Sequence, residues 1–365
     1  MTTSRSRFSP SEALGTRIRL ARAQRGLTKA ALARATGFSV RQIDEYEAQG
    51  APAAHVGRLA AELHVPEPYL THEGVDPILT SEARFRSLSR ATERQRSAAR
   101  AAGTSGIELY EWLADRFRLP SVVLPDLDGE APERAADAVR AAWEQGRGAL
   151  PNLTQLAEAN GVRVVSLPPI AHTVDAYSLW REDRPYVFLS TMKSVERRRF
   201  DLAHEIGHLV LHSRGHGGDL EREADEFAAA FLMPADLLLA RVGKEPAVPA
   251  VLRLRSDYGV AAMAMLRRLH DLGVLSDEVY RQDCVVLGQR GFRSGEPGGL
   301  RPERSRVFEQ TLGLLRSSGT SVDVIASEVG LSVQDLHDLT FGHFVLSLTG
   351  GSAPRTTRQG TLRVV

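Results

Sequence analysis

Two histidines with a glutamate beside the first form the segment of this sequence best suited to chemistry. His204 and His208 are four residues apart, so on a helix both imidazole rings would project from one face and could bind one metal ion. Glu205 would lie next to that metal without binding it. This placement suits a base that takes a proton from a water molecule on a zinc ion. We therefore predict a zinc peptidase centre with His204 and His208 as ligands and Glu205 as the catalytic base.

A catalytic zinc ion usually has three protein ligands and leaves a fourth position for water, so a third ligand must be found. The tenth residue after His204 is Arg214, which cannot serve. A helix is expected just beyond it, and Glu221 and Asp225 would share one face of that helix. We predict Glu221 as the third ligand and Asp225 as the carboxylate that accepts the distal N–H of a ligand histidine. Glu223 lies on another face of the helix and is not expected at the metal.

The sequence leaves the roles of several other residues near the motif open. His212 and His216 are expected to be surface or packing histidines rather than ligands. Tyr177, Tyr186 and His216 are the candidates for stabilising the oxyanion beside zinc, and the sequence does not choose among them. The strand expected at 186–189 could hold a substrate along its edge, or it could be an edge strand that only packs on the motif helix.

Two runs around the motif are specific when taken together: RFDLAHEIGHLVLH at 199–212 and EREADEFAAAFLMP at 221–234. They resemble the ImmA/IrrE family of metallopeptidases, and the resemblance extends over residues 135–275. It implies a gluzincin-like centre with Zn²⁺ as cofactor and Glu221 as the third ligand. For several members it also implies cleavage of a repressor protein, which frees stress-response or mobile-element genes.

Short helices with recognisable boundaries are predicted over residues 12–72. Thr28 is a predicted N-cap, Gly37 ends that helix, and Ser39 with Gln42 forms a capping box for the next one. The pattern resembles the XRE (lambda-repressor-like) helix-turn-helix family. The matching residues are Leu14, Gly15, Ile18, Leu20, Leu27, Thr28, Leu32, Ala33, Gly37, Phe38, Ser39, Ile43, Tyr46, Glu47, Leu59 and Ala60.

The helix-turn-helix resemblance implies that the helix at 40–48 enters the major groove of DNA. Arg41 and Gln42 would then contact base edges, while three residues near helix N-termini would hold phosphates. These three are Thr28, Lys29 and Ser39. The rest of the helix is acidic and would repel phosphate unless its side chains face away. These acidic residues are Asp44, Glu45 and Glu47. A helical module that binds protein is the alternative.

Composition sets limits on the class of protein. Of the 365 residues, 42% are hydrophobic and 25% are charged, which excludes a wholly disordered chain. The net charge is only +1, but residues 1–41 hold nine Lys or Arg against Glu12 alone, a local balance of 9 − 1 = +8. Cys284 is the single cysteine, which excludes an intrachain disulfide and a zinc site built from cysteines. Without an apolar signal region or a stretch of ~20 apolar residues, we expect no membrane contact and a cytoplasmic location.

The elements that would position the motif are mostly helices. Residues 76–119 are expected to be helical with interruptions near Gly103 and Gly106, and residues 120–132 a loop. Strands are predicted at 162–165, 176–180 and 186–189, with the last two forming a β-hairpin. Residues 320–339 repeat the helix-turn-helix rhythm with acidic residues, so we interpret them as a structural or dimerisation bundle, with DNA binding the lesser alternative.

The predicted fold is therefore mainly α with a small β-sheet (α+β). The predicted segments are a helix-turn-helix DNA-binding domain at 1–75, a helical linker region at 76–134, a zincin-like metallopeptidase domain at 135–245, a helical C-terminal region at 246–345 and a disordered tail at 346–365. The predicted function is an intracellular zinc endopeptidase that regulates transcription by cleaving a repressor. The predicted partners are DNA, a repressor-type substrate and a second copy of this chain. The alternative is a non-proteolytic XRE-family regulator whose peptidase-like domain senses a metal or ligand.

Overall fold

The computed structural model describes residues 9–72, 76–82, 84–85, 91–212, 219–343 and 363–364. Helices dominate and the strands are few, so the fold is α+β, as predicted. The chain divides into two compact units. The first, here called the helical unit, comprises residues 1–119, 165–175 and 306–365. The second, the motif unit, comprises residues 120–164 and 176–305. In the described part of the chain, no helix is both long and apolar enough to cross a membrane.

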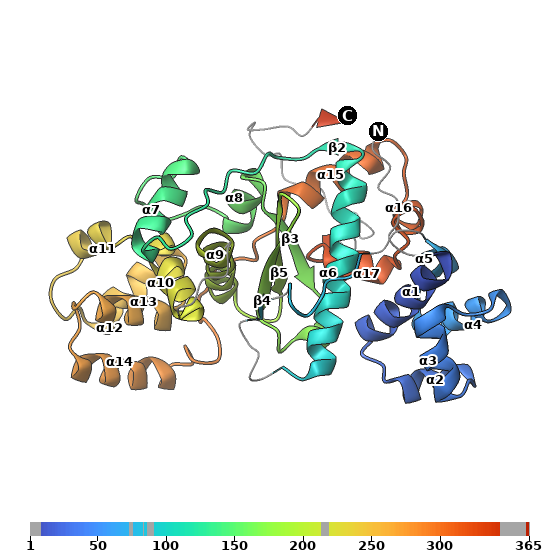
Figure 1. Cartoon of the computed structure of the whole chain (residues 1–365). Coiled ribbons are helices and arrows are strands. Elements are labelled where there is room, and N and C mark those ends of the chain that lie inside the picture. The colour runs from blue at the N-terminus through green and yellow to red at the C-terminus, as the bar shows by residue number, and fades with distance from the viewer. Residues whose placement is uncertain are drawn as a thin grey trace. The chain divides into compact units, whose positions relative to one another are not determined.

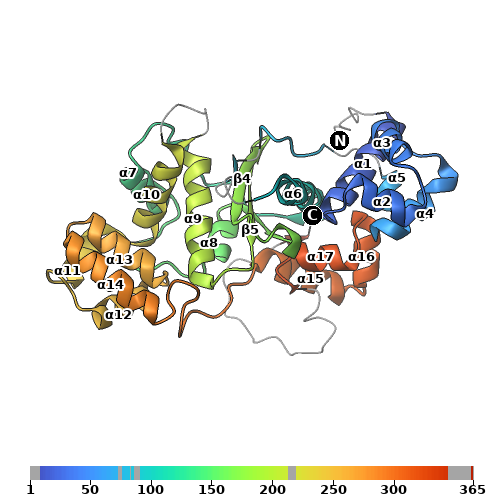
Figure 2. The ribbon, with the colours of Figure 1, turned by 90° about the horizontal axis from the view of Figure 1, so that it is seen from below.

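The helical unit begins with five short helices, coloured blue in Figure 2. They are α1 (Pro10–Gln24), α2 (Lys29–Thr36), α3 (Val40–Gln49), α4 (Ala53–Leu63) and α5 (Glu67–Thr71). The predicted boundaries are confirmed. The Thr28 hydroxyl caps α2, Gly37 ends it with a φ of 72°, and Ser39 and Gln42 form the capping box of α3.

The longest helix of the helical unit, α6 (Glu93–Ala114), runs without a break through Gly103 and Gly106. The predicted interruptions there are wrong. A Cβ atom on Gly106 would lie 2.7 Å from Val165 Cγ1, so this glycine allows close packing rather than a bend. The remaining elements of this unit are β1 (Arg84–Phe85), β2 (Phe117–Arg118), η1 (Pro169–Ala171), α15 (Arg306–Ser317), α16 (Val322–Val329), α17 (Val333–Leu339) and β6 (Arg363–Val364).

The C-terminal helices of the helical unit are tied to α1 by a buried polar cluster. The Asp335 carboxylate on α17 accepts hydrogen bonds from the Arg25 guanidinium at 2.7 and 2.8 Å and from the Gln24 amide at 3.0 Å. The Gln24 carbonyl in turn accepts from the Ser105 hydroxyl on α6 at 3.2 Å. These contacts agree with a structural role for residues 320–339. Most of the predicted disordered tail, 346–365, lies outside the described residues, although β6 pairs antiparallel with β2.

The motif unit places one long helix between a β-hairpin and further helices. Its elements are α7 (Pro132–Ala142), α8 (Leu153–Ala159), β4 (Ala176–Arg181), β5 (Arg184–Ser190), α9 (Val195–Leu211), α10 (Leu220–Leu232), α11 (Ala235–Arg241), α12 (Val248–Tyr258), α13 (Ala262–Asp271) and α14 (Asp277–Gln289). The first two residues of β3 (Arg163–Leu167) also belong to this unit. Figure 1 shows α9 with the hairpin on one side and α7 and α10 on the other. The helix that carries His204, Glu205 and His208 is therefore inside the unit.

The hairpin of β4 and β5 is antiparallel, and a two-residue turn at Glu182 and Asp183 joins its strands, as predicted. Glu182 has a positive φ of 54°, which suits a tight hairpin turn. The sheet order places β5 between β4 and β3. Residues 186–189 are therefore not at an edge of the sheet, so both alternatives predicted for them, an edge that holds a substrate and an edge that only packs on the motif helix, are wrong.

Arg140 on α7 holds the end of α10 in place. Its guanidinium donates to the carbonyl of Phe231 in the last turn of α10 and to the carbonyls of Gly146 and Gly148. The side chain is 3% exposed, so water cannot replace these donors. Arg140 therefore fixes the C-terminal end of α10, the helix that carries Glu221 in its first turn.

Arg140→Ala is expected to lower the free energy of unfolding by at least about 3 kcal/mol, because it leaves buried carbonyls without donors. Chemical denaturation of the purified chain measures this change. Arg134→Ala, on the exposed side of the same helix, is the matched control and should change stability by less than about 0.5 kcal/mol. Equal effects of the two substitutions would contradict the role given to Arg140.

Candidate functional site

Helix α9 carries the zinc motif and is buried along most of its length. Ser194 caps its N-terminus, and the apolar residues of the motif pack on both sides. His204 and Glu205 are 0% exposed and His208 is 5% exposed, unusual burial for ionisable side chains. A Cβ atom on Gly207 would lie 3.0 Å from the Phe227 ring. This glycine therefore lets α10 lie close to the histidines.

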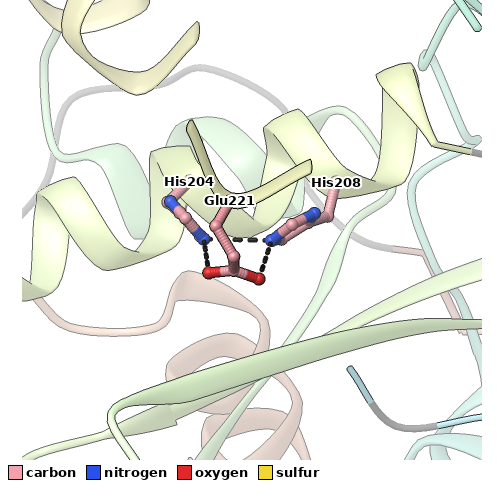
Figure 3. Close-up of side chains that lie close together, drawn as sticks. All are labelled: His204, His208 and Glu221. Atoms are coloured by element: carbon pink, nitrogen blue, oxygen red, sulfur yellow. Dashed lines mark hydrogen bonds and ion pairs between the residues drawn. The ribbon is translucent and has the colours of Figure 1, made fainter. Parts of the chain in front are cut away.

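The close contact with α10 brings Glu221 over the two histidines, as Figure 3 shows. His204 Nε2 and His208 Nε2 are 3.0 Å apart. The Glu221 carboxylate oxygens lie 3.5 Å from His204 Nε2 and 3.4 Å from His208 Nε2. Two ligands of a tetrahedral zinc ion are about 3.3 Å apart, given Zn–N and Zn–O bonds of about 2.0–2.1 Å. The three predicted ligands thus form a group whose spacing and donor types fit Zn²⁺.

Charge at the group also suits a cation. Hydrogen bonds with His204 and His208 hold the pKa of Glu221 far below its usual range, so this carboxylate stays ionised. Asp225 Oδ1 lies 2.8 Å from His204 Nδ1, the ring nitrogen that faces away from His208. That contact is the one predicted from the spacing of Glu221 and Asp225. With a metal bound, this contact would keep the proton of His204 on Nδ1 and leave the Nε2 lone pair for the metal.

The Glu205 carboxylate lies on the side of α9 that faces the hairpin. Its Oε2 accepts a hydrogen bond from the Ser178 hydroxyl on β4 at 2.6 Å. Its Oε1 is buried and has no hydrogen-bond partner among the described residues. Burial raises the pKa of Glu205, and the neighbouring His208 and His204 oppose this rise. A raised pKa and a free oxygen are the properties of a general base.

Sequence reasoning missed three contributors to this site. Ser178 lies on the same face of β4 as Trp180, whose indole N–H donates to the Leu209 carbonyl on α9, and no sequence pattern connects it with Glu205. His212 is buried, and its Nδ1 lies 2.9 Å from His208 Nδ1. Its Nε2 lies 3.0 Å from Glu223. Glu223 is outside the ligand group, as predicted, but it is connected to His208 through His212. His216 lies outside the described residues.

This arrangement agrees with a comparison to known families. Residues 157–270 match the peptidase family M78 model, described as the IrrE N-terminal-like domain. The match runs from the end of α8 into α13 and includes His204, Glu205, His208 and Glu221. The sequence matches none of the curated proteins with which it was compared. The chain thus contains a metallopeptidase-like domain, here called the IrrE-like domain, which supports the ImmA/IrrE part of the resemblance.

Two of the three predicted oxyanion residues do not face the metal group of the IrrE-like domain. Tyr177 pairs across the hairpin with Phe188, and Tyr186 pairs with Leu179. Both tyrosines are therefore on the face opposite Ser178, the residue that contacts α9. The Tyr186 hydroxyl accepts from Arg163 at 2.5 Å. Neither tyrosine can stabilise an oxyanion at His204 and His208, so this prediction is wrong for both.

Ser178→Ala is expected to lower peptide cleavage by about 10-fold without changing zinc affinity, because it removes the donor that orients Glu205. Initial cleavage rates and zinc titration of the same preparation measure the two quantities. Ser178→Thr keeps the hydroxyl and should retain more activity than the alanine variant. Wild-type cleavage by Ser178→Ala would contradict the orienting role.

The predicted DNA-contacting residues cluster at the N-termini of α2 and α3 in the helical unit. Arg41 is exposed and makes no ion pair with any described residue. Gln42 and Ser39 are occupied by their mutual capping box. Thr28 caps α2, and the Lys29 ammonium pairs with Asp44 at 2.5 Å. Arg41 is therefore the predicted residue best placed to reach a base edge without first losing a contact.

Internal ion pairs consume much of the basic excess near the N-terminus. Four of the nine basic residues pair within the helical unit: Arg17 with Glu108, Arg22 with Glu47, Arg25 with Asp335 and Lys29 with Asp44. The local balance of +8 thus overstates the exposed positive charge. The same pairs engage two of the three acidic residues of α3, Glu47 with Arg22 and Asp44 with Lys29, while Glu45 stays exposed.

Proposed function

We propose that this chain is a zinc-dependent endopeptidase. The observation that carries the proposal is the group formed by His204, His208 and Glu221, with the buried Glu205 carboxylate beside it. Two neutral imidazoles and one carboxylate are the donor set of many catalytic zinc sites. Glu205 is a buried carboxylate beside the ligands, and its Oε1 has no hydrogen-bond partner among the described residues. A protein that only sensed a metal would not require such a group.

The residues of the site would divide the work of hydrolysis. Bound zinc would supply Lewis acidity toward the scissile carbonyl. Glu205 would take a proton from the attacking water and pass it to the leaving amine. Ser178 holds one oxygen of that carboxylate, so the other is available for the proton. Asp225 keeps His204 in the tautomer that binds metal.

We further propose that the peptidase is coupled to DNA through α1–α5 and acts in the cytoplasm on a repressor protein. The confirmed caps of α2 and α3 and the exposed Arg41 support the helix-turn-helix part. The ImmA/IrrE resemblance supports a repressor substrate. Cleavage would then change transcription at genes of a stress response or a mobile element.

The direct test is to incubate the zinc-loaded, full-length chain with the purified repressor encoded by a neighbouring gene. Intact-mass spectrometry should detect two fragments of the repressor. Removing zinc with a chelator should abolish cleavage, and adding zinc back should restore it. A repressor that stays whole, while the chain binds zinc and alters transcription from the operator, would favour the non-proteolytic sensor.

Arg41→Ala is expected to weaken sequence-specific DNA binding by about 1–3 kcal/mol, because one base contact from the N-terminal end of α3 is lost. Mobility-shift titrations against the operator and an unrelated duplex measure specific and non-specific affinity. Lys244→Ala, an exposed substitution in the motif unit, is the charge-matched control. Equal operator affinity for wild type and Arg41→Ala would favour the protein-binding alternative for α1–α5.

A further inference from the structure

His208 is followed by a chain of two hydrogen-bonded side chains that leads away from the metal group. His208 Nδ1 lies 2.9 Å from His212 Nδ1, and His212 Nε2 lies 3.0 Å from Glu223 Oε2. His212 is 5% exposed, so its ring is shielded from water. The Glu223 side chain is 31% exposed and keeps contact with solvent. The chain thus begins at a partly exposed carboxylate and ends at a buried predicted ligand.

A metal ion on His208 Nε2 would set the direction of each hydrogen bond in this chain. A neutral imidazole that binds a metal through Nε2 carries its hydrogen on Nδ1, so His208 would donate to His212 Nδ1. An accepting Nδ1 places the hydrogen of His212 on Nε2, from which His212 would donate to Glu223. His208 Nε2 is the atom that faces Glu221 and His204. The distances therefore fit one set of tautomers, in which the lone pair of His208 faces the metal group.

We propose that His212 and Glu223 are positioning residues that set the tautomer and ring orientation of His208 for metal binding. The proposal rests on the proposed zinc centre and extends it beyond the three ligands and Asp225. Helix α10 then supplies three carboxylates to α9. Glu221 is the third ligand, Asp225 contacts His204 directly, and Glu223 acts on His208 through His212.

The position of His212 explains why an intermediate ring is needed. Asp225 reaches His204 with a direct contact of 2.8 Å. His212 is one turn beyond His208 and is the C-cap residue of α9, where its backbone N–H donates to the His208 carbonyl at 3.2 Å. From that place its ring spans the distance between His208 and Glu223. A residue without an acceptor at the Nδ1 position cannot replace it.

The test measures zinc affinity of the full-length chain by competition with a chromophoric chelator. His212→Phe keeps the ring volume but removes the acceptor, and it is expected to weaken zinc binding by about 10–100-fold. His212→Asn places an amide oxygen near the Nδ1 position and should restore most of the affinity. Glu223→Ala should weaken binding, and Glu226→Gln, on the exposed side of α10, is the matched control. His212→Phe binding zinc as tightly as wild type would overturn the proposal.

A second measurement reads the tautomers directly, and it holds even if a ring substitution prevents folding. In ¹⁵N NMR spectra of the zinc-loaded wild type, His212 should carry its hydrogen on Nε2, and His204 and His208 should carry theirs on Nδ1. A hydrogen on His212 Nδ1 would overturn the proposal while leaving the zinc centre intact. A wild-type chain that binds no zinc would instead overturn the proposed function and this extension together.

Discussion

Glu205→Gln is expected to lower kcat/KM for peptide cleavage by about 10²–10⁴-fold while zinc affinity stays within a few fold of wild type. Glutamine has nearly the shape of glutamate and can still accept the hydrogen bond from Ser178, so the local packing should persist. It cannot take up a proton at neutral pH. The expected loss is therefore confined to the chemical step, and it should appear in kcat rather than in zinc content.

The measurement is a cleavage time course with zinc quantified in the same sample by elemental mass spectrometry. Another glutamate of α9, Glu196, cannot serve as the control, because its buried carboxylate accepts a hydrogen bond from the backbone N–H of Leu300. Glu182→Gln, in the exposed hairpin turn, tests the same chemical change away from the metal group. Undiminished cleavage by a zinc-loaded Glu205→Gln variant would remove Glu205 from the mechanism.

Glu221→Ala is expected to weaken zinc binding by more than the roughly 10–100-fold typical of losing an outer hydrogen-bond partner, because it removes one of three direct ligands. Cleavage should fall in parallel at limiting zinc. The Glu221 side chain is half exposed, so the substitution leaves no buried group without a partner and should not prevent folding. Zinc competition titrations measure the affinity, and thermal unfolding checks the fold.

Glu226→Ala is the matched control for Glu221, since both glutamates are on α10 and, among the described residues, Glu226 pairs with the exposed Arg222. It should bind zinc as wild type does. If Glu221→Ala keeps wild-type affinity, the third ligand lies elsewhere.

Local features were predictable from the sequence because they depend on neighbouring residues. The Thr28 N-cap and the terminal glycine of α2, the capping box of α3 and the hairpin all follow from short patterns whose physics is local. The grouping of His204, His208 and Glu221 was also predictable, since helical spacing places two ligands and the family resemblance indicates the third.

Features that depend on contacts between distant segments were not predictable. Gly106 was expected to break a helix, but it lies in α6 where Val165 packs closely. Ser178 is 27 residues from its partner Glu205, and no sequence pattern connects them. The local balance of +8 near the N-terminus did not reveal that Arg25 pairs with Asp335, which is 310 residues away. Spacing in the sequence predicts which residues share a face of one helix or strand. These contacts instead depend on how different helices and strands pack together.

The most direct test of the proposed peptidase is to identify new protein N-termini by mass spectrometry. The zinc-loaded wild type and the Glu205→Gln variant are each incubated with a lysate of the cells that express this chain. We predict new N-termini in the wild-type sample, foremost in a DNA-binding repressor, and none of them with Glu205→Gln or after zinc removal. The same set of N-termini with wild type, variant and zinc-free chain would contradict peptidase activity at His204, Glu205 and His208.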